Sequence, residues 1–247
     1  MTSTRLKSKV IAVTGGTRGI GLAIARRLLQ EGARVAICGR SQPALDSAIA
    51  GLAGDGDVFG VTADVSNRAN VSEFFTGVMK RFGRLDALIN NAGVGIFKAV
   101  ADLTPEEWER MIGLNLSGVY YCCHHVLPIF RQQASGDIIN ISSLAGKNAF
   151  AGGAGYNASK FGLNGFSEAM MLDHRNDGVR VSYIMPGSVA TDFGGQTREN
   201  EQGGRSDKDA WKIAPEDVAE MVTTLLTMPR RTTVSRVEIR PSRPPVK

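Results

Sequence analysis

Short apolar segments alternate with longer amphipathic segments along the whole chain, and this alternation limits the folds that the chain can adopt. The apolar segments, which we interpret as strands, are residues 9–14, 34–38, 58–62, 87–90, 137–141, 180–184 and 236–239. The predicted helices are 19–31, 42–52, 67–82, 105–132, 156–175 and 215–227. Strands that are apolar throughout are typical of a parallel sheet with helices on both faces. With right-handed crossovers, the pattern predicts an α/β, Rossmann-type, doubly wound parallel sheet of about seven strands in three αβα layers.

The length of 247 residues suits one substantial α/β domain with a well-buried core. No linker-like segment and no repeat beyond the strand–helix alternation divides the sequence, so residues 1–247 are predicted to form a single domain. Residues 194–209 are polar and rich in glycine, and they belong to a predicted substrate loop at about 190–213. This loop either closes over a substrate as a lid or is simply disordered.

Charge and hydropathy exclude two classes of partner. The net charge is +5, but the basic residues are scattered or lie near the chain ends, without the compact basic and aromatic runs of a nucleic-acid surface. We therefore expect no nucleic-acid partner. The N-terminus has no apolar signal core, and no stretch of about 18 residues is apolar enough to cross a membrane. A soluble protein with no membrane contact is expected.

The cysteines indicate neither a disulfide framework nor a metal site. Cys38, Cys122 and Cys123 lack paired spacing and lie in apolar segments, which favours a reducing, cytoplasmic location. His124 and His125 follow the cysteine pair directly, but adjacent helical residues point about 100° apart and cannot close around one ion. Helix packing is the expected role of this run, and no metal is predicted.

The first predicted strand is followed by a glycine-rich turn, Thr-Gly-Gly-Thr-Arg-Gly-Ile-Gly, at residues 14–21. Glycines let the backbone turn sharply and approach a ligand closely, and the helix that follows offers free amides to a pyrophosphate. The glycines lie at 15, 16, 19 and 21, which departs from the common dinucleotide-binding spacing. The turn predicts a dinucleotide site; the alternative is a glycine-rich connection without a ligand.

Arg40 and Ser41 follow the second predicted strand, where an acidic residue would bind the ribose hydroxyls of NAD. Arg18 lies in the glycine turn. Two guanidinium groups and a hydroxyl suit a ribose 2′-phosphate, which favours NADP(H) over NAD(H). The alternative is that Arg40 stacks on adenine or points into solvent.

Tyr156 and Lys160 lie four residues apart in a predicted helix and so share one face. A phenol normally ionises near pH 10, and a neighbouring ammonium is expected to lower the pKa of Tyr156 toward neutrality. Ser143, from another segment, is able to hold a substrate oxygen beside the phenol. These groups predict proton transfer to or from a carbonyl or alcohol oxygen.

These motifs, in this order, resemble the short-chain dehydrogenase/reductase family in its single-domain form, and the resemblance covers nearly the whole chain. The motifs that carry it are the glycine turn at 14–21, Asp64-Val65, Asn-Asn-Ala-Gly at 90–93, Asn115, Ile-Ser-Ser at 141–143, Tyr-Asn-Ala-Ser-Lys at 156–160 and Pro-Gly-Ser-Val-Ala-Thr at 186–191.

The resemblance implies catalytic roles for four residues. Tyr156 would be the general acid or base, Lys160 would lower its pKa and bind the nicotinamide ribose, and Ser143 would orient the substrate oxygen. Asn115 would hold the helix geometry and a water in a proton relay. The residues implied to bind the cofactor are Gly15, Thr17, Arg18, Gly19, Ile20, Gly21, Arg40, Ser41, Asp64, Val65, Asn91, Ala92, Gly93, Tyr156, Lys160, Pro186, Gly187, Val189 and Thr191.

The predicted walls of the substrate site are mostly small or apolar, which favours a carbonyl or alcohol of modest polarity. They are Val94, Phe97, Leu144, Ala145, Asn148, Phe150, Gly187, Ser188 and Phe193. The expected activity is NADP(H)-dependent carbonyl reduction or alcohol oxidation. The narrower alternative is a reductase of 3-oxoacyl thioesters, similar to the 3-oxoacyl-ACP reductase-like members of the family. The other alternative is a cofactor sensor without turnover.

The resemblance also implies a homotetramer or homodimer. The helices that contain Pro105 and Tyr156 would pair across a two-fold axis, and residues 234–239 would form a second contact.

Overall fold

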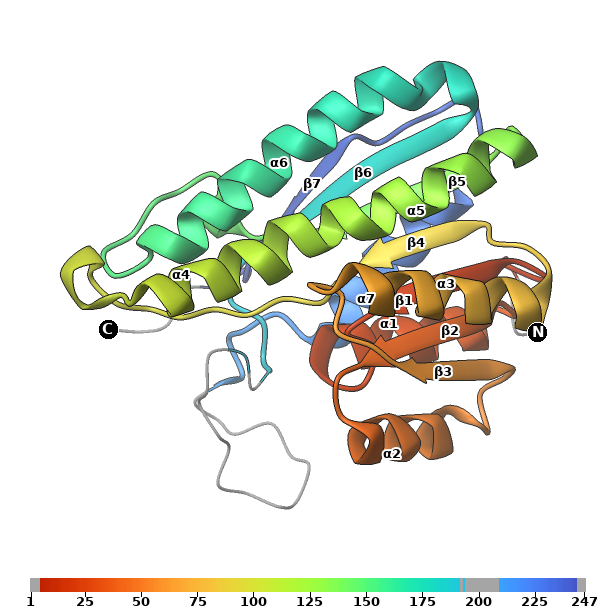
Figure 1. Cartoon of the computed structure of the whole chain (residues 1–247), viewed down its shortest axis with the longest axis horizontal. Coiled ribbons are helices and arrows are strands. Elements are labelled where there is room, and N and C mark those ends of the chain that lie inside the picture. Colours follow the sequence, from red (N-terminus) through yellow and green to blue (C-terminus); the bar gives the residue numbers. More distant parts are fainter. Residues whose placement is uncertain (1–4, 192, 194–208, 244–247) are drawn as a thin grey trace.

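The computed structural model describes residues 5–191, 193 and 209–243 (Figure 1). The predicted lid, 194–209, lies outside these residues except for its last position. The described strands are β1 (Val10–Thr14), β2 (Arg34–Gly39), β3 (Val58–Thr62), β4 (Ala87–Asn90), β5 (Gly136–Ile141), β6 (Val179–Pro186) and β7 (Arg236–Ile239).

All seven described strands form one parallel sheet in the order β3-β2-β1-β4-β5-β6-β7. The order runs outward from β1 in one direction through β2 and β3, and in the other direction through β4 to β7. A doubly wound sheet reverses in this way, and ligands bind where the strand order reverses, beyond the carboxyl ends of the strands. The sheet confirms the predicted fold class.

Helices cover both faces of the sheet. They are α1 (Gly19–Gln30), α2 (Gln42–Leu52), α3 (Arg68–Phe82), α4 (Pro105–Ile112), α5 (Gly118–Gln133), α6 (Ala154–His174) and α7 (Pro215–Thr227) (Figure 1). Ile11 and Val13 of β1 pack with α1, α2 and α7, whereas Val10 and Ala12 pack with α3, α5 and α6. Because alternate strand residues point to opposite faces, one fully apolar strand supplies both cores.

The predicted continuous helix at 105–132 is wrong at its centre. Residues Gly113–Ser117 form a π-helical turn, η2, in which the amide of Gly118 donates to the carbonyl of Gly113, five residues earlier. The side chain of Asn115 in this turn bonds the backbone of Val94 twice, at 2.8 Å each, and this contact accounts for the irregular turn. The other element ends agree with the prediction or differ from it by one or two residues, with the largest differences in β6 and α6.

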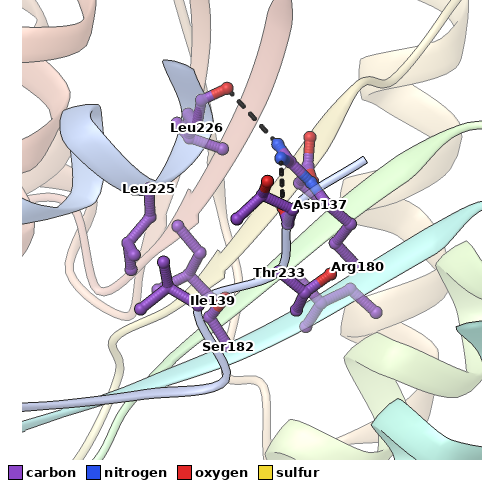
Figure 2. Close-up of a pocket in the computed structure, with 10 residues that line it drawn as sticks. Asp137, Ile139, Arg180, Ser182, Leu225, Leu226 and Thr233 are labelled. Atoms are coloured by element: carbon purple, nitrogen blue, oxygen red, sulfur yellow. Dashed lines mark hydrogen bonds and ion pairs between the residues drawn. The ribbon is translucent and has the colours of Figure 1, made fainter. Parts of the chain in front are cut away.

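A cluster of charged side chains stabilises the sheet near the amino ends of β5 and β6. Asp137 and Arg180 are partners in the register of β5 and β6, and their side chains bond at 2.6 Å (Figure 2). The guanidinium of Arg180 also donates to backbone carbonyls that follow α7, including those of Met228 at 2.9 Å and Thr232 at 3.1 Å. Arg230 bonds the second oxygen of Asp137 at 2.9 Å. Asp137 therefore fixes the connection between α7 and β7, in line with its predicted place at an element end.

Within the described part of the chain, no helix combines the length and apolarity that crossing a membrane requires.

Candidate active site

A cavity of about 1020 Å³ lies at the carboxyl ends of the strands. Its walls come from the segments that follow six strands: Gly15 to Ile20 after β1, Arg40 and Ser41 after β2, Asp64 and Val65 after β3, Asn91 to Gly93 after β4, Ser142 to Ala145 after β5, and Gly187 to Val189 after β6. A cavity here is where a doubly wound sheet binds its ligand. Most of the predicted site residues are brought together in it.

The glycine turn needs its glycines. Gly15 and Gly19 have left-handed backbones, with φ of +64° and +54°. A Cβ on Gly15 would lie 2.9 Å from the Cα of Ala92, and a Cβ on Gly21 would collide with the carbonyl of Gly15. No side chain caps the N-terminus of α1, so its first amides are open to an anion. The turn fits a dinucleotide pyrophosphate.

Thr14, which the sequence analysis did not single out, braces the turn against the segment after β4. Its hydroxyl accepts hydrogen bonds from the amides of Asn91 and Ala92 at 3.0 and 3.1 Å. The amide side chain of Asn91 donates to the carbonyls of Thr14 and Gly15 at 3.0 and 3.1 Å. Thr14 is a polar residue at the end of an otherwise apolar strand, and this feature of the sequence could have identified it as part of the site.

Arg18 and Arg40 are exposed and line the same end of the cavity. Ser41 caps α2 by accepting from the amide of Ala44 at 3.4 Å. The carboxylate of Asp64, the nearest acidic group after the strands, is engaged by Ser66, whose amide and hydroxyl donate to it at 2.9 and 2.6 Å. This wall therefore carries two guanidinium groups and one carboxylate, whose Oδ1 is already hydrogen-bonded.

Ser143, Tyr156 and Lys160 meet at the other end of the cavity. Tyr156 lies in the first turn of α6, and its phenol hydrogen-bonds the hydroxyl of Ser143, which follows β5. The ammonium nitrogen of Lys160 lies 5.9 Å from the centre of the Tyr156 ring and donates to the carbonyl of Ile141 at 3.0 Å. The neighbouring Ser142 instead donates to Asn164 at 2.5 Å, which supports the choice of Ser143.

Burial governs the ionisation of both groups. Burial raises the pKa of Tyr156 to about 12, and the hydrogen bond from Ser143 opposes this only in part. Burial lowers the pKa of Lys160 to about 8. The prediction that the pKa of Tyr156 is lowered toward neutrality is wrong for this structure, because desolvation of the phenol outweighs the hydrogen bond that opposes it. A phenol with this pKa is protonated near neutral pH and is suited to act as an acid.

Asn115 does not line the cavity but lies fully buried behind it. Besides its two bonds to Val94, its amide donates to the hydroxyl of Ser159 at 3.0 Å. It thereby ties η2 and the segment after β4 to the helix that carries Tyr156. The predicted water relay through Asn115 stays a prediction.

The sequence analysis missed some lining residues, and two further residues that it named do not line the cavity. Val94 and Gly21 lie outside the cavity lining, because Val94 is held against Asn115 and Gly21 is covered by the carbonyl of Gly15. The lining residues that the sequence analysis missed include Trp211, Lys212, Arg240 and Pro241. They reach the cavity through long-range contacts: Ile213 pairs with Val189, and Pro241 lies against Gly187.

Cys122, Cys123 and His125 of the Cys-Cys-His-His run pack as predicted, whereas His124 is exposed. Cys122 and Cys123 are buried in the core, and the ring of His125 stacks on Phe75 at 5.3 Å. Among the described residues, no group of three or more His, Cys, Asp and Glu side chains has the geometry of a metal site.

The sheet, the glycine turn and the Ser143, Tyr156 and Lys160 cluster define an oxidoreductase of the Rossmann-type class. The family model described as short chain dehydrogenase matches residues 9–202, and the chain belongs to this family.

Relatives match nearly the whole chain. An uncharacterised oxidoreductase of Staphylococcus aureus is 34% identical over 96% of this chain and 99% of its own length. Among solved structures, a metagenomic short-chain oxidoreductase in complex with NADP is 36% identical, with a TM-score of 0.83 over 97% of this chain and 100% of that one. An alcohol dehydrogenase from the archaeon Thermococcus sibiricus, complexed with 5-hydroxy-NADP, is 31% identical, with a TM-score of 0.87 over the same shares.

Proposed function

We propose that the protein transfers a hydride between NADP(H) and a carbonyl or secondary alcohol, with Tyr156 as the general acid or base. The observation that carries the proposal is the shared cavity: the Ser143–Tyr156 hydrogen bond lies at one end and the glycine turn at the other. When bound, NADPH supplies the hydride to the carbonyl carbon. The proton that balances it comes from the phenol of Tyr156 to the carbonyl oxygen.

The residues of the chain supply position and charge for this step. Ser143 donates to the substrate oxygen and holds it beside the phenol, and both groups stabilise the negative charge that develops there. Lys160 lies one helical turn beyond Tyr156, and its ammonium stabilises the phenolate that proton transfer leaves. The family assignment and the two NADP-complexed structures support this reaction class.

An NADPH-oxidation screen tests the reaction. Wild-type protein is expected to oxidise NADPH in the presence of at least one ketone, aldehyde, quinone or 3-oxoacyl thioester. Turnover confined to the thioesters would select the narrower alternative. Binding of NADPH with no turnover of any carbonyl would favour the cofactor-sensor alternative, which the presence of Ser143, Tyr156 and Lys160 argues against.

The preference for NADP(H) is proposed to rest on Arg40 and Arg18. Arg40→Asp should weaken NADPH binding about 10- to 150-fold, because a charge-assisted hydrogen bond to the 2′-phosphate is lost and a repelling charge replaces it. Binding of NADH should be unchanged or tighter. Titrations of both cofactors measure the ratio, with Arg175→Asp, an exposed arginine outside the cavity, as the matched control. If the ratio of the NADPH and NADH affinities were unchanged in Arg40→Asp, Arg40 would not determine the preference for NADP(H).

A homodimer or homotetramer is proposed to form through α4, α5 and α6. Trp108 of α4, Tyr120 of α5 and Leu172 of α6 are large apolar side chains that are exposed on this side of the fold. Tyr120 and Phe166 lie edge to face at 6.3 Å, so the patch joins α5 to α6. Apolar exposure of this kind supports a subunit contact.

The three cysteines are free and buried, which agrees with the proposed reducing location.

A further inference from the structure

Four aromatic rings surround the proposed reaction centre. Phe97 lies edge to face on Tyr156, with ring centres 5.5 Å apart, and Phe193 lies against Tyr156 at 5.7 Å. Phe150 lies against Phe97 at 5.8 Å. All four residues line the cavity. We name the three phenylalanines Phe97, Phe150 and Phe193 the aromatic slot.

The slot presents unusual apolar surface to the cavity. Phe97, Phe150 and Phe193 are 47%, 46% and 42% exposed, whereas Tyr156 is only 8% exposed. An exposed apolar ring is common, but three that meet at one cavity beside a buried phenol form a patch that a ligand can cover. Covering these rings would remove their surface from water, which favours an apolar occupant.

The three phenyl rings pack against the glycine backbone at Gly95 and Gly153. A Cβ on Gly95 would lie 2.6 Å from Cε1 of Phe193 and 2.8 Å from Cζ of Phe97. A Cβ on Gly153 would lie 2.7 Å from Cζ of Phe150. Each phenyl ring therefore packs on a position where any other residue would displace it. Glycine at these two positions therefore leaves room for the three rings beside the cavity.

Two cations that line the cavity, Arg240 and Lys212, are paired with carboxylates. Arg240 is paired with Glu238 at 3.0 Å, and Glu238 is also held by Lys147 at 2.6 Å. Lys212 is paired with Asp209 at 2.6 Å. Carboxylates thus offset the charge of these two lining cations, and the ammonium of Lys160 is the cation that lies beside the phenol.

We propose that the aromatic slot selects carbonyl substrates that carry an aromatic ring close to the carbonyl group. This inference rests on the proposed function, because it places the carbonyl at Ser143 and Tyr156. Phenyl rings interact through their positive edges and negative faces, and these interactions add to the effect of buried area. In the slot, a flat aromatic substituent gains from both ring–ring interactions and buried apolar area. An alkyl chain of equal size gains only from buried area.

Three methyl ketones with the same number of carbons test the slot: benzyl methyl ketone, cyclohexylmethyl methyl ketone and heptyl methyl ketone. Their carbonyl groups are unconjugated and equally substituted, so a difference in kcat/KM reports on recognition. Wild-type protein is expected to favour the benzyl ketone over the heptyl ketone about tenfold. Phe97→Leu, Phe150→Leu and Phe193→Leu should each reduce this ratio several-fold. Phe161→Leu, an equally exposed phenylalanine outside the cavity, should leave it unchanged.

Binding measurements separate failure of the slot from failure of the proposed reaction. Titration of the three ketones into Tyr156→Phe saturated with NADPH reports recognition without turnover. Turnover by wild-type protein with no aromatic preference, or with a preference that survives all three substitutions in the slot, would overturn the slot and leave the proposed function standing. Ranked binding of the ketones, with no wild-type turnover of any carbonyl in the NADPH-oxidation screen, would uphold the slot and overturn the reaction. Absence of both ranked binding and turnover in that screen would overturn both.

Discussion

Tyr156→Phe should bind NADPH as tightly as wild-type protein and lose carbonyl reduction by about 10²- to 10⁴-fold in kcat. The substitution removes only the hydroxyl that donates the proton and keeps the ring that packs between Phe97 and Phe193. Single-turnover oxidation of NADPH measures the chemical step. Quenching of tryptophan fluorescence by NADPH measures binding, since Trp211 lines the cavity.

Tyr120→Phe is the matched control for this experiment. Tyr120 is exposed on α5 and does not line the cavity, so removal of its hydroxyl should leave kcat unchanged. A Tyr156→Phe protein with a kcat close to the wild-type value would contradict the assignment of the acid. Weakened NADPH binding with unchanged chemistry would give Tyr156 a binding role in its place.

Lys160→Met should lose activity and gain stability. Lys160 is buried and its amino group bonds one carbonyl, so its positive charge is held away from water without a carboxylate partner in the described structure. Removing a charge that burial penalises should stabilise the folded protein by roughly 3 kcal/mol at pH 7, which is the scale of the shift in the pKa of Lys160 from 10.5 to about 8. The same change removes the group that would stabilise the Tyr156 phenolate.

The stability gain should depend on pH with a definite sign. Between about pH 8 and 10.5 the unfolded chain keeps the proton that folded Lys160 has released, so wild-type stability should rise with pH in this window. The difference between Lys160→Met and wild type should therefore be largest below pH 8 and shrink toward pH 10. Denaturant unfolding at pH 7, 8.5 and 10 measures it. Lys80→Met, at an exposed position, should show no such trend. A Lys160→Met protein less stable than wild type at pH 7 would contradict the account of burial.

The sequence predicted the sheet well because most strand residues are apolar and each helix has a polar face. Ile11 and Val13 face one core and Val10 and Ala12 the other, and this alternation is what a doubly covered parallel sheet requires. The π-helical turn η2 was not predicted. Its residues are ordinary for a helix, and the irregularity comes from the contact of Asn115 with Val94, 21 positions away.

The candidate site was predictable where chemistry follows local spacing and less so where it depends on burial. The glycine turn, Ser143, Tyr156 and Lys160 all reach one cavity, as their motifs indicate. The pKa of Tyr156 was predicted in the wrong direction, because spacing in a helix reveals the neighbouring ammonium but not the loss of water around the phenol. Trp211 and Arg240 were missed since only tertiary contacts bring them to the cavity.

The π-helical turn η2 also determines the rotation of α5 about its own axis, and so which of its side chains face the core. Such a turn contains one residue more than an α-helical turn, and each helical residue advances the direction of the side chains by about 100°. If the same residues were wound as a regular α-helix, α5 would be rotated by about 100° about the helix axis relative to its present position. Val126 and Phe130, now buried against the sheet, would then point elsewhere. The π-helical turn that holds Asn115 behind the active site thus also orients α5, so that its apolar side chains face the core.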